Sequence, residues 1–124
     1  MKKLIANSVL AGILAMATGA SAEMLTEEDY APALQNKNTY CRYLSIEASE
    51  IAAKRDKGVT RGQVRAIYAG YVDVRFILND IFDAVDLVFE YPRLSPEDES
   101  AQFYYGCIEF FESGGGSDRE SFNF

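Results

Sequence analysis

The sequence predicts an all-α protein, a small bundle of four to five helices held together by one disulfide. Three observations favour this fold class. Apolar residues recur every three to four positions through most of residues 23–112, which is the spacing that gives a helix one apolar face. Capping and turn signals divide that region into short segments. Cys41 and Cys107 fall on the apolar faces of two of those segments.

The first half of the predicted domain holds a short helical segment and one longer helix. Thr26 precedes three acidic residues, which is typical of a capped helix start, and Pro32 limits this segment. A predicted turn at residues 36–38 leads into a helix from about residue 39 to residue 57. Gly58 follows basic residues at the end of this helix, and together they form a stop signal.

Residues 61–91 predict either one long helix or two helices with a bend near residues 70–73. Thr60 and Gln63 fit a capping box at the start, and a helical apolar period continues through the region. The β-branched and aromatic residues in 85–91 leave a strand as the alternative there. The sequence leaves these alternatives open.

The last predicted helix has the clearest start. Ser95 is in the N-cap position, Pro96 follows at the first helical position, and acidic residues fill the first turn. Pro92 separates this helix from the preceding one. Residues 113–124 then begin with a run of serine and glycine, which predicts a flexible tail.

Residues 1–22 have the pattern of a cleavable secretory signal. Two lysines precede an apolar run over residues 4–17, and the small residues Ala20 and Ala22 match the cleavage pattern. The run is shorter than the roughly 20 residues that span a bilayer. We therefore expect one soluble helical domain over residues 23–112, not inserted in a membrane, in the periplasm of a Gram-negative bacterium or secreted.

An oxidising compartment and an even number of cysteines predict that Cys41 and Cys107 form a disulfide. The bridge closes a loop of more than sixty residues. Loop-closure entropy then stabilises the fold by about 4 kcal/mol. A redox-active pair is the alternative, but the C-x-x-C spacing of such pairs is absent.

The charge of the chain limits its partners. The sequence has 12 basic and 19 acidic residues, and without Lys2 and Lys3 of the signal it has 10 basic residues and a net charge of −9. Because nucleic acid and anionic lipid repel such a surface, the sequence predicts neither as a partner and favours a basic protein. The alternative is that the acidity only keeps the protein soluble. The sequence predicts no oligomeric state.

The side chains on which many enzymes depend are missing. The sequence has no histidine, no G-x-G-x-x-G segment and no P-loop. This excludes Ser-His-Asp and Cys-His catalysis and histidine-based metal sites. We therefore predict no catalytic residues, no cofactor and no metal, and expect a non-enzymatic binding or interaction protein. An enzyme that works with carboxylates, Lys, Arg and Tyr alone is an alternative.

A row of acidic residues with apolar residues between them is the predicted partner site. It lies on one side of region 61–91 and offers apolar anchors ringed by charge to a basic protein. The alternative is a solvated face whose apolar members pack against a neighbouring helix. The row consists of Asp73, Phe76, Asp80, Asp83, Leu87 and Glu90.

Two further features admit a structural or a functional interpretation. Arg55 continues the apolar stripe of its helix, where an arginine usually packs its stem and pairs its head with an acid; a ligand or partner contact is the alternative. Aromatic residues near Cys107 predict core packing around the bridge, or the pocket of a periplasmic carrier or sensor of a small apolar ligand. They are Phe103, Tyr104, Tyr105, Phe110 and Phe111.

Several short segments resemble those of known proteins. The chain resembles a group of short secreted proteobacterial proteins without an assigned activity at Cys41, at residues 52–58 (AAKRDKG), 88–98 (VFEYPRLSPED) and 105–107 (YGC). That resemblance implies a small helical fold with a Cys–Cys bridge. Residues 58–64 (GVTRGQV) are similar to a segment of the periplasmic immunity proteins of type VI secretion, which are helical and neutralise effectors by binding.

Overall fold

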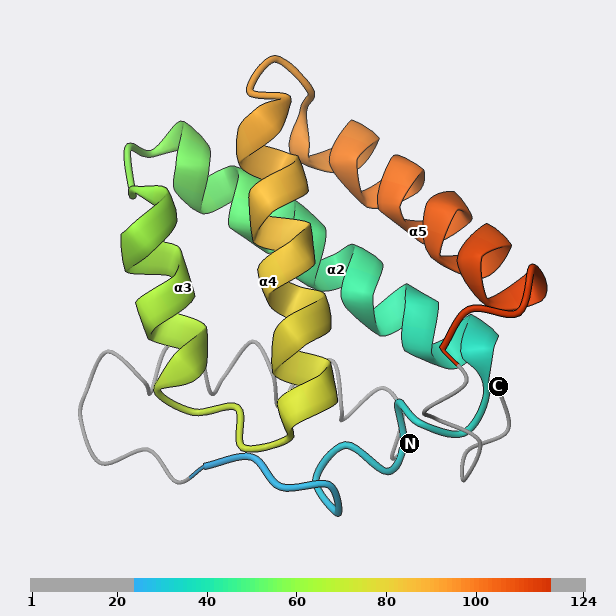
Figure 1. The fold of residues 1–124 in the computed structure, drawn as a ribbon. Coiled ribbons are helices and arrows are strands. Elements are labelled where there is room, and N and C mark those ends of the chain that lie inside the picture. The colour runs from blue at the N-terminus through green and yellow to red at the C-terminus, as the bar shows by residue number, and fades with distance from the viewer. Residues whose placement is uncertain (1–23, 117–124) are drawn as a thin grey trace.

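The computed structural model describes residues 24–116, and this part of the chain is helical (Figure 1). The all-α fold class is confirmed. The predicted signal at residues 1–22 and the tail residues 117–124 lie outside the described residues. Four helices follow one another in the described part: α2 (Lys37–Asp56), α3 (Arg61–Ala69), α4 (Arg75–Glu90) and α5 (Pro96–Glu112).

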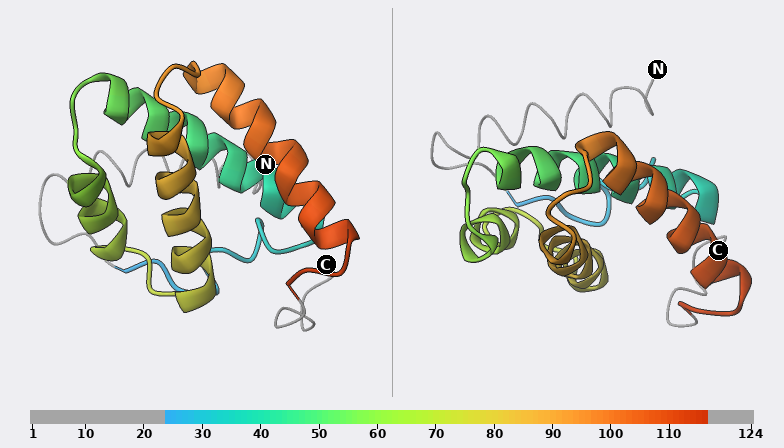
Figure 2. Two further views of the ribbon diagram at one scale, coloured as in Figure 1. Left: turned by 45° about the horizontal axis from the view of Figure 1, so that its top comes forward. Right: turned by 90° about the horizontal axis from the view of Figure 1, so that it is seen from above.

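Helix α2 is the central element of the bundle. Helix α5 runs along it, α4 crosses it, and α3 packs beside α4 (Figures 1 and 2). Helices α4 and α5 each contact α2 far more than they contact one another. The two helices therefore form walls over a floor supplied by α2.

The core lies where α2, α3 and α4 meet. Burying a large aliphatic side chain stabilises a fold by about 1.5–3 kcal/mol, so these residues supply much of the driving force. Fully buried members are Ala48, Ile51 and Ala52 of α2, Val64 and Tyr68 of α3, and Ile77, Ile81 and Val85 of α4.

The start of α2 differs slightly from the prediction. The helix begins at Lys37, because the Asn36 side chain accepts a hydrogen bond from the Thr39 backbone N–H at 2.9 Å and caps it. The predicted helical segment that starts at Thr26 is a series of turns over residues 27–34. Pro32 lacks the N–H that a continuing helix needs at that position.

The region 61–91 forms two helices, and the single-helix alternative is wrong. Helix α3 ends at Ala69 and Gly70 is its C-cap. The next residues pair with the N-terminal segment: the Leu25 N–H donates to the Tyr71 carbonyl at 2.6 Å, and the Asp73 N–H donates to the Leu25 carbonyl at 2.9 Å. The strand alternative is also wrong, because α4 continues to Glu90.

Helix α5 begins as predicted, and the disulfide is confirmed. The Ser95 side chain accepts a hydrogen bond from the Asp98 N–H at 3.1 Å. Cys41 of α2 and Cys107 of α5 are bonded, with their Cα atoms 5.6 Å apart. Within residues 24–116, no helix is long and apolar enough to cross a membrane.

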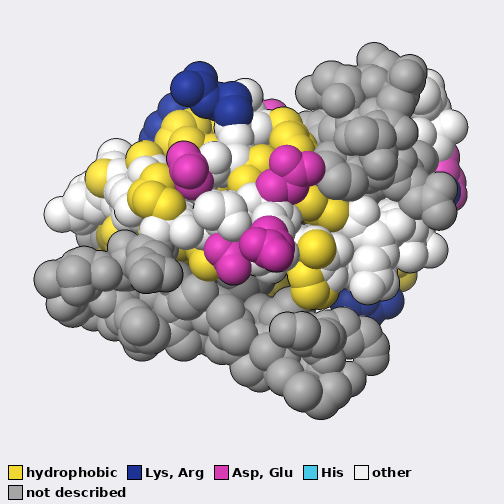
Figure 3. Space-filling view, turned by 90° about the horizontal axis from the view of Figure 1, so that it is seen from below, with side chains coloured by type: hydrophobic (Ala, Val, Ile, Leu, Met, Phe, Trp, Pro, Cys, Tyr) yellow, Lys and Arg dark blue, Asp and Glu magenta, His cyan; other side chains and the backbone are white. Residues whose placement is uncertain are grey.

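The described surface mixes acidic and hydrophobic side chains. In the view from below, separate Asp and Glu side chains lie between hydrophobic ones, and Lys and Arg side chains gather toward the edges (Figure 3). This distribution accords with the acidic composition of the chain, whose net charge at pH 7 is −7.

Candidate functional site

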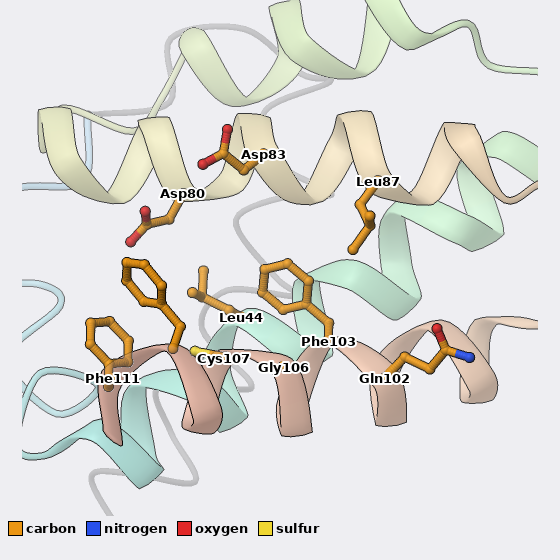
Figure 4. Close-up of a pocket in the computed structure, with 10 residues that line it drawn as sticks. Leu44, Asp80, Asp83, Leu87, Gln102, Phe103, Gly106, Cys107 and Phe111 are labelled. Atoms are coloured by element: carbon orange, nitrogen blue, oxygen red, sulfur yellow. The ribbon is translucent and has the colours of Figure 1, made fainter. Parts of the chain in front are cut away.

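A groove separates α4 from α5, with α2 behind it (Figure 4). Its volume is about 250 Å³. The floor residue is Leu44 of α2, and the α4 wall consists of Asp80, Asp83 and Leu87. The α5 wall consists of Gln102, Phe103, Gly106, Cys107, Phe110 and Phe111.

The two walls differ in charge. The α5 wall has no charged side chain, whereas the α4 wall carries two carboxylates. The Tyr40 hydroxyl donates a hydrogen bond to Asp80 Oδ2 at 2.5 Å, which holds this carboxylate in place. Asp83 is exposed, and no side chain of residues 24–116 is seen to bond to it. The groove therefore combines an apolar wall with an acidic one.

Aromatic rings form a continuous row at one end of the groove. Phe110 and Phe111 stack edge to face at 5.2 Å, Phe111 lies 6.1 Å from Tyr40, and Tyr40 lies 6.3 Å from Phe76. Phe111 is buried, but Phe110 is 52% exposed. An exposed ring supported by buried rings is a ready apolar contact for a bound molecule.

Gly106 leaves a bare stretch of backbone in the α5 wall. Glycine inside a helix is about 0.5–1 kcal/mol less favourable than alanine. A Cβ atom at Gly106 has no neighbour within 4 Å, so packing within the described chain does not require glycine there. Gly106 is one of the residues that line the groove, so a bound molecule can approach the helix backbone closely there.

The structure brings together half of the predicted acidic row. Asp80, Asp83 and Leu87 line the groove. Asp73 lies in the loop before α4, because the break between α3 and α4 removes it from the row. Phe76 packs half-buried against Tyr40, and the remaining member of the row, Glu90, is exposed at the end of α4.

The predicted aromatic cluster divides between the groove and the surface of α5. Phe103, Phe110 and Phe111 line the groove. Tyr104 and Tyr105 do not; they pack edge to face at 5.4 Å, and Tyr105 is 70% exposed.

Arg55 joins three parts of the fold. Its guanidinium is nearly buried and forms an ion pair with Glu99 of α5 at 2.9 Å. It also donates to the carbonyls of Val88 at 2.8 Å, Tyr91 at 3.2 Å and Leu94 at 2.6 Å. One side chain thus ties the end of α4, the connection and the start of α5 to α2. These contacts are structural, and they lie outside the groove.

The core contains a buried acid that was not among the predicted site residues. Glu47 of α2 is 0% exposed, and the Tyr68 hydroxyl donates to its Oε1 at 2.6 Å. Its Oε2 has no hydrogen-bond partner. Burial raises the pKa of Glu47 to about 8, and the charge of nearby Glu50 adds to the rise. The raised pKa favours the protonated, neutral form of this carboxyl.

A pattern in the sequence could have revealed this acid. Glu47 lies three residues after Leu44 and four before Ile51, inside the apolar period of α2. Because no solvent reaches it, Glu47 has no access to a substrate in this structure. Residues 24–116 also contain no group of three or more acidic or cysteine side chains placed to hold a metal ion.

Comparisons with protein-family models, with curated proteins and with solved structures find no match to this chain. The two resemblances of short segments to known proteins therefore remain predictions.

Proposed function

We propose that the protein is a non-enzymatic binding protein that holds an apolar, positively charged segment of a partner protein between α4 and α5. The observation that carries this proposal is the groove itself, with an uncharged apolar wall facing two carboxylates. An apolar side chain of the partner fits against Phe103 and Phe110, and a lysine or arginine beside it meets Asp83.

The size of the groove favours a protein segment over a small molecule. Pockets for small ligands usually have about 300–1,000 Å³ and enclose most of the ligand. This groove holds about 250 Å³, and its edges at Leu87 and Phe110 are 38% and 52% exposed. It therefore suits one or two anchoring side chains of a larger molecule.

The two kinds of wall have different roles in this proposal. An exposed ion pair contributes about 0–1 kcal/mol, so Asp80 and Asp83 supply little affinity by themselves. They orient the partner and reject acidic segments, because like charges repel. The apolar contacts along α5 supply most of the affinity.

The proposal includes an extracytoplasmic location, in the periplasm or outside the cell. It is supported by the signal pattern of residues 1–22 and by the disulfide between Cys41 and Cys107. Disulfides persist in oxidising compartments and are rare in the cytosol. A partner is then another exported or surface protein with a basic, apolar segment.

Selection from a library of displayed random peptides tests the proposal. Peptides enriched on the purified protein are expected to carry a leucine or phenylalanine next to lysine or arginine. Their affinity should fall at least ten-fold for Leu87→Glu, which puts a charge on the apolar contact. It should fall less for Asp80→Asn with Asp83→Asn.

The chain offers a matched control for the charge variant. Asp73→Asn with Glu90→Gln removes the same number of charges from the same predicted row, but neither residue lines the groove. Equal losses in the two double variants mean that only net charge matters, which contradicts the proposal. Enriched peptides without basic residues also contradict it.

A further inference from the structure

We infer that residues 117–124 of the same chain lie in the groove when no partner is bound, so that a partner must displace them. The docking of this segment is independent of the proposed function, whereas its competition with a partner rests on it. Three observations carry the inference: the direction in which the chain leaves α5, the chemistry of the segment, and the fit between its length and the groove.

The chain turns back at the end of α5 onto a residue of the groove. Gly114 and Gly116 have φ of +95° and +76°, values that favour glycine, and they reverse the chain. The Gly115 N–H donates to the Phe110 carbonyl at 2.9 Å. A Cβ on Gly115 would lie 2.5 Å from the Phe110 ring, so the backbone lies directly against it. The described part of the chain therefore ends beside Phe110, at the groove edge.

The segment contains both kinds of side chain that the groove can bind, one cation and two aromatic rings. It reads SDRESFNF and contains one cation, Arg119, and two aromatic residues, Phe122 and Phe124. In an extended segment, neighbouring side chains point to opposite sides. Arg119 can therefore face the acidic α4 wall while Phe122 and Phe124 face the apolar α5 wall.

The order and the length of the segment also fit. Phe111 and Asp80 lie at the end of the groove where the chain leaves α5, and Leu87 lies toward the other end (Figure 4). Arg119 comes first along the segment, and the phenylalanines come later. Eight extended residues span up to about 26 Å. The α5 wall from Gln102 to Phe111 spans only about 14 Å.

The phenylalanines contribute more to this contact than the arginine. Asp118 and Glu120 flank Arg119 and give the segment a net charge of −1, so the charges of the segment supply no net attraction to the acidic α4 wall. Apolar contact between the phenylalanines and the α5 wall remains. Removing the two phenyl rings is therefore the sharper perturbation.

NMR spectra of the full chain without any peptide test the docking. Phe122→Ser with Phe124→Ser should shift the Gly106 amide and the methyl signals of Leu44 and Leu87. The matched variant Ser121→Ala with Asn123→Ala alters the same segment without removing a ring and should leave those signals in place. Unchanged groove signals in the phenylalanine variant overturn the inference.

A charge exchange tests the orientation of the segment. Arg119→Glu should shift the groove signals part of the way toward the phenylalanine variant. Adding Asp83→Lys to Arg119→Glu restores an opposite pair and should return them toward the wild-type positions. If Arg119→Glu shifts the groove signals but the added Asp83→Lys does not move them back toward the wild-type positions, the proposed direction of the segment is wrong.

Peptide affinity tests the competition. A tethered segment has an effective concentration of about 1 mM at the groove. If the segment docks with a dissociation constant of about 0.1 mM, it lowers the affinity of a competing peptide about ten-fold. A peptide from the library selection should therefore bind Phe122→Ser with Phe124→Ser about ten times more tightly than wild type. Equal affinities overturn the competition. Absence of any peptide binding overturns the proposed function, while the peptide-free spectra still decide the docking.

Discussion

Replacing Glu47 by glutamine should remove a large pH dependence of stability. The pKa of Glu47 is raised from 4.5 to about 8 in the folded protein, because the carboxyl is buried in the core. A raised pKa means that the folded state keeps a proton that the unfolded state has already released. The resulting stability is fully present below pH 4.5 and is lost as the pH rises to about 8.

The size of the effect follows from the shift of the Glu47 pKa. The shift is 8 − 4.5 = 3.5 units, and each unit corresponds to about 1.4 kcal/mol, which makes about 5 kcal/mol in all. Between pH 5 and pH 8 the free energy of unfolding should fall by about 3.5 kcal/mol, because a small part of the effect lies below pH 5 and another part remains at pH 8. Since small domains have a total stability of about 5–15 kcal/mol, this loss is easily measured.

Glutamine at position 47 stays neutral at every pH and can still accept the hydrogen bond of Tyr68. Urea unfolding is followed by circular dichroism at pH 5, 6.5 and 8. The free energy of unfolding should fall less between pH 5 and pH 8 in Glu47→Gln than in wild type. Glu109→Gln, at an exposed position of α5, is the control and should keep the wild-type slope. A wild-type stability that is flat or rises between pH 5 and pH 8 refutes the reasoning.

Three further variants test the supports of the fold and of the groove. Serine in place of both Cys41 and Cys107 should lower the free energy of unfolding by about 4 kcal/mol, measured by urea titration, because the bridge restrains the unfolded chain. Arg55→Met should cost about 3–5 kcal/mol in the same titration, because Glu99 is left buried without its ion pair; Arg55→Met combined with Glu99→Leu should recover part of that loss. Gly106→Ala should raise the free energy of unfolding by about 0.5–1 kcal/mol and should weaken the binding of selected peptides. If this variant is more stable and also binds the peptides more tightly, Gly106 does not serve to let a bound molecule approach the helix backbone.

The ends of the helices were predictable because their signals are local. The capping box of α3 needs only Thr60 and Gln63, which exchange hydrogen bonds at 3.1 and 2.9 Å. The start of α5 likewise depends on a serine cap and a proline within two residues. Such contacts lie within one turn of helix, so the residue pattern alone identifies them.

The break between α3 and α4 was not decided by the sequence, because it depends on a distant contact. Leu25 pairs with residues 71–73, which lie more than forty positions away in the chain. The apolar period continues across the break, so periodicity permits both one helix and two. On one continuous helix Asp73 would lie in the same row as Asp80. Because the structure has two helices, Asp73 lies outside that row.

The groove could not be predicted for a related reason. Periodicity shows which face of a helix is apolar, but it does not show which helix covers that face. Asp80 and Asp83 were identified from the α4 sequence, whereas the opposite wall from Gln102 to Phe111 follows from the packing of α5 along α2. The same packing explains why the aromatic residues of α5 divide between groove and surface.

Arg55 and Glu47 show why similar sequence patterns have different outcomes. Each is an ionisable residue within the apolar period of α2. Arginine stays charged when buried, so Arg55 needs an opposite charge, and Glu99 with three carbonyls meets that need. A carboxyl can instead become neutral by keeping its proton. Glu47 has one tyrosine donor and a neighbouring acid, and its raised pKa favours this neutral form. Two things therefore differ between these residues: the charge state that each side chain can adopt, and the groups that neighbouring helices place beside it. The α2 sequence shows the first, because it gives the residue type. It does not show the second.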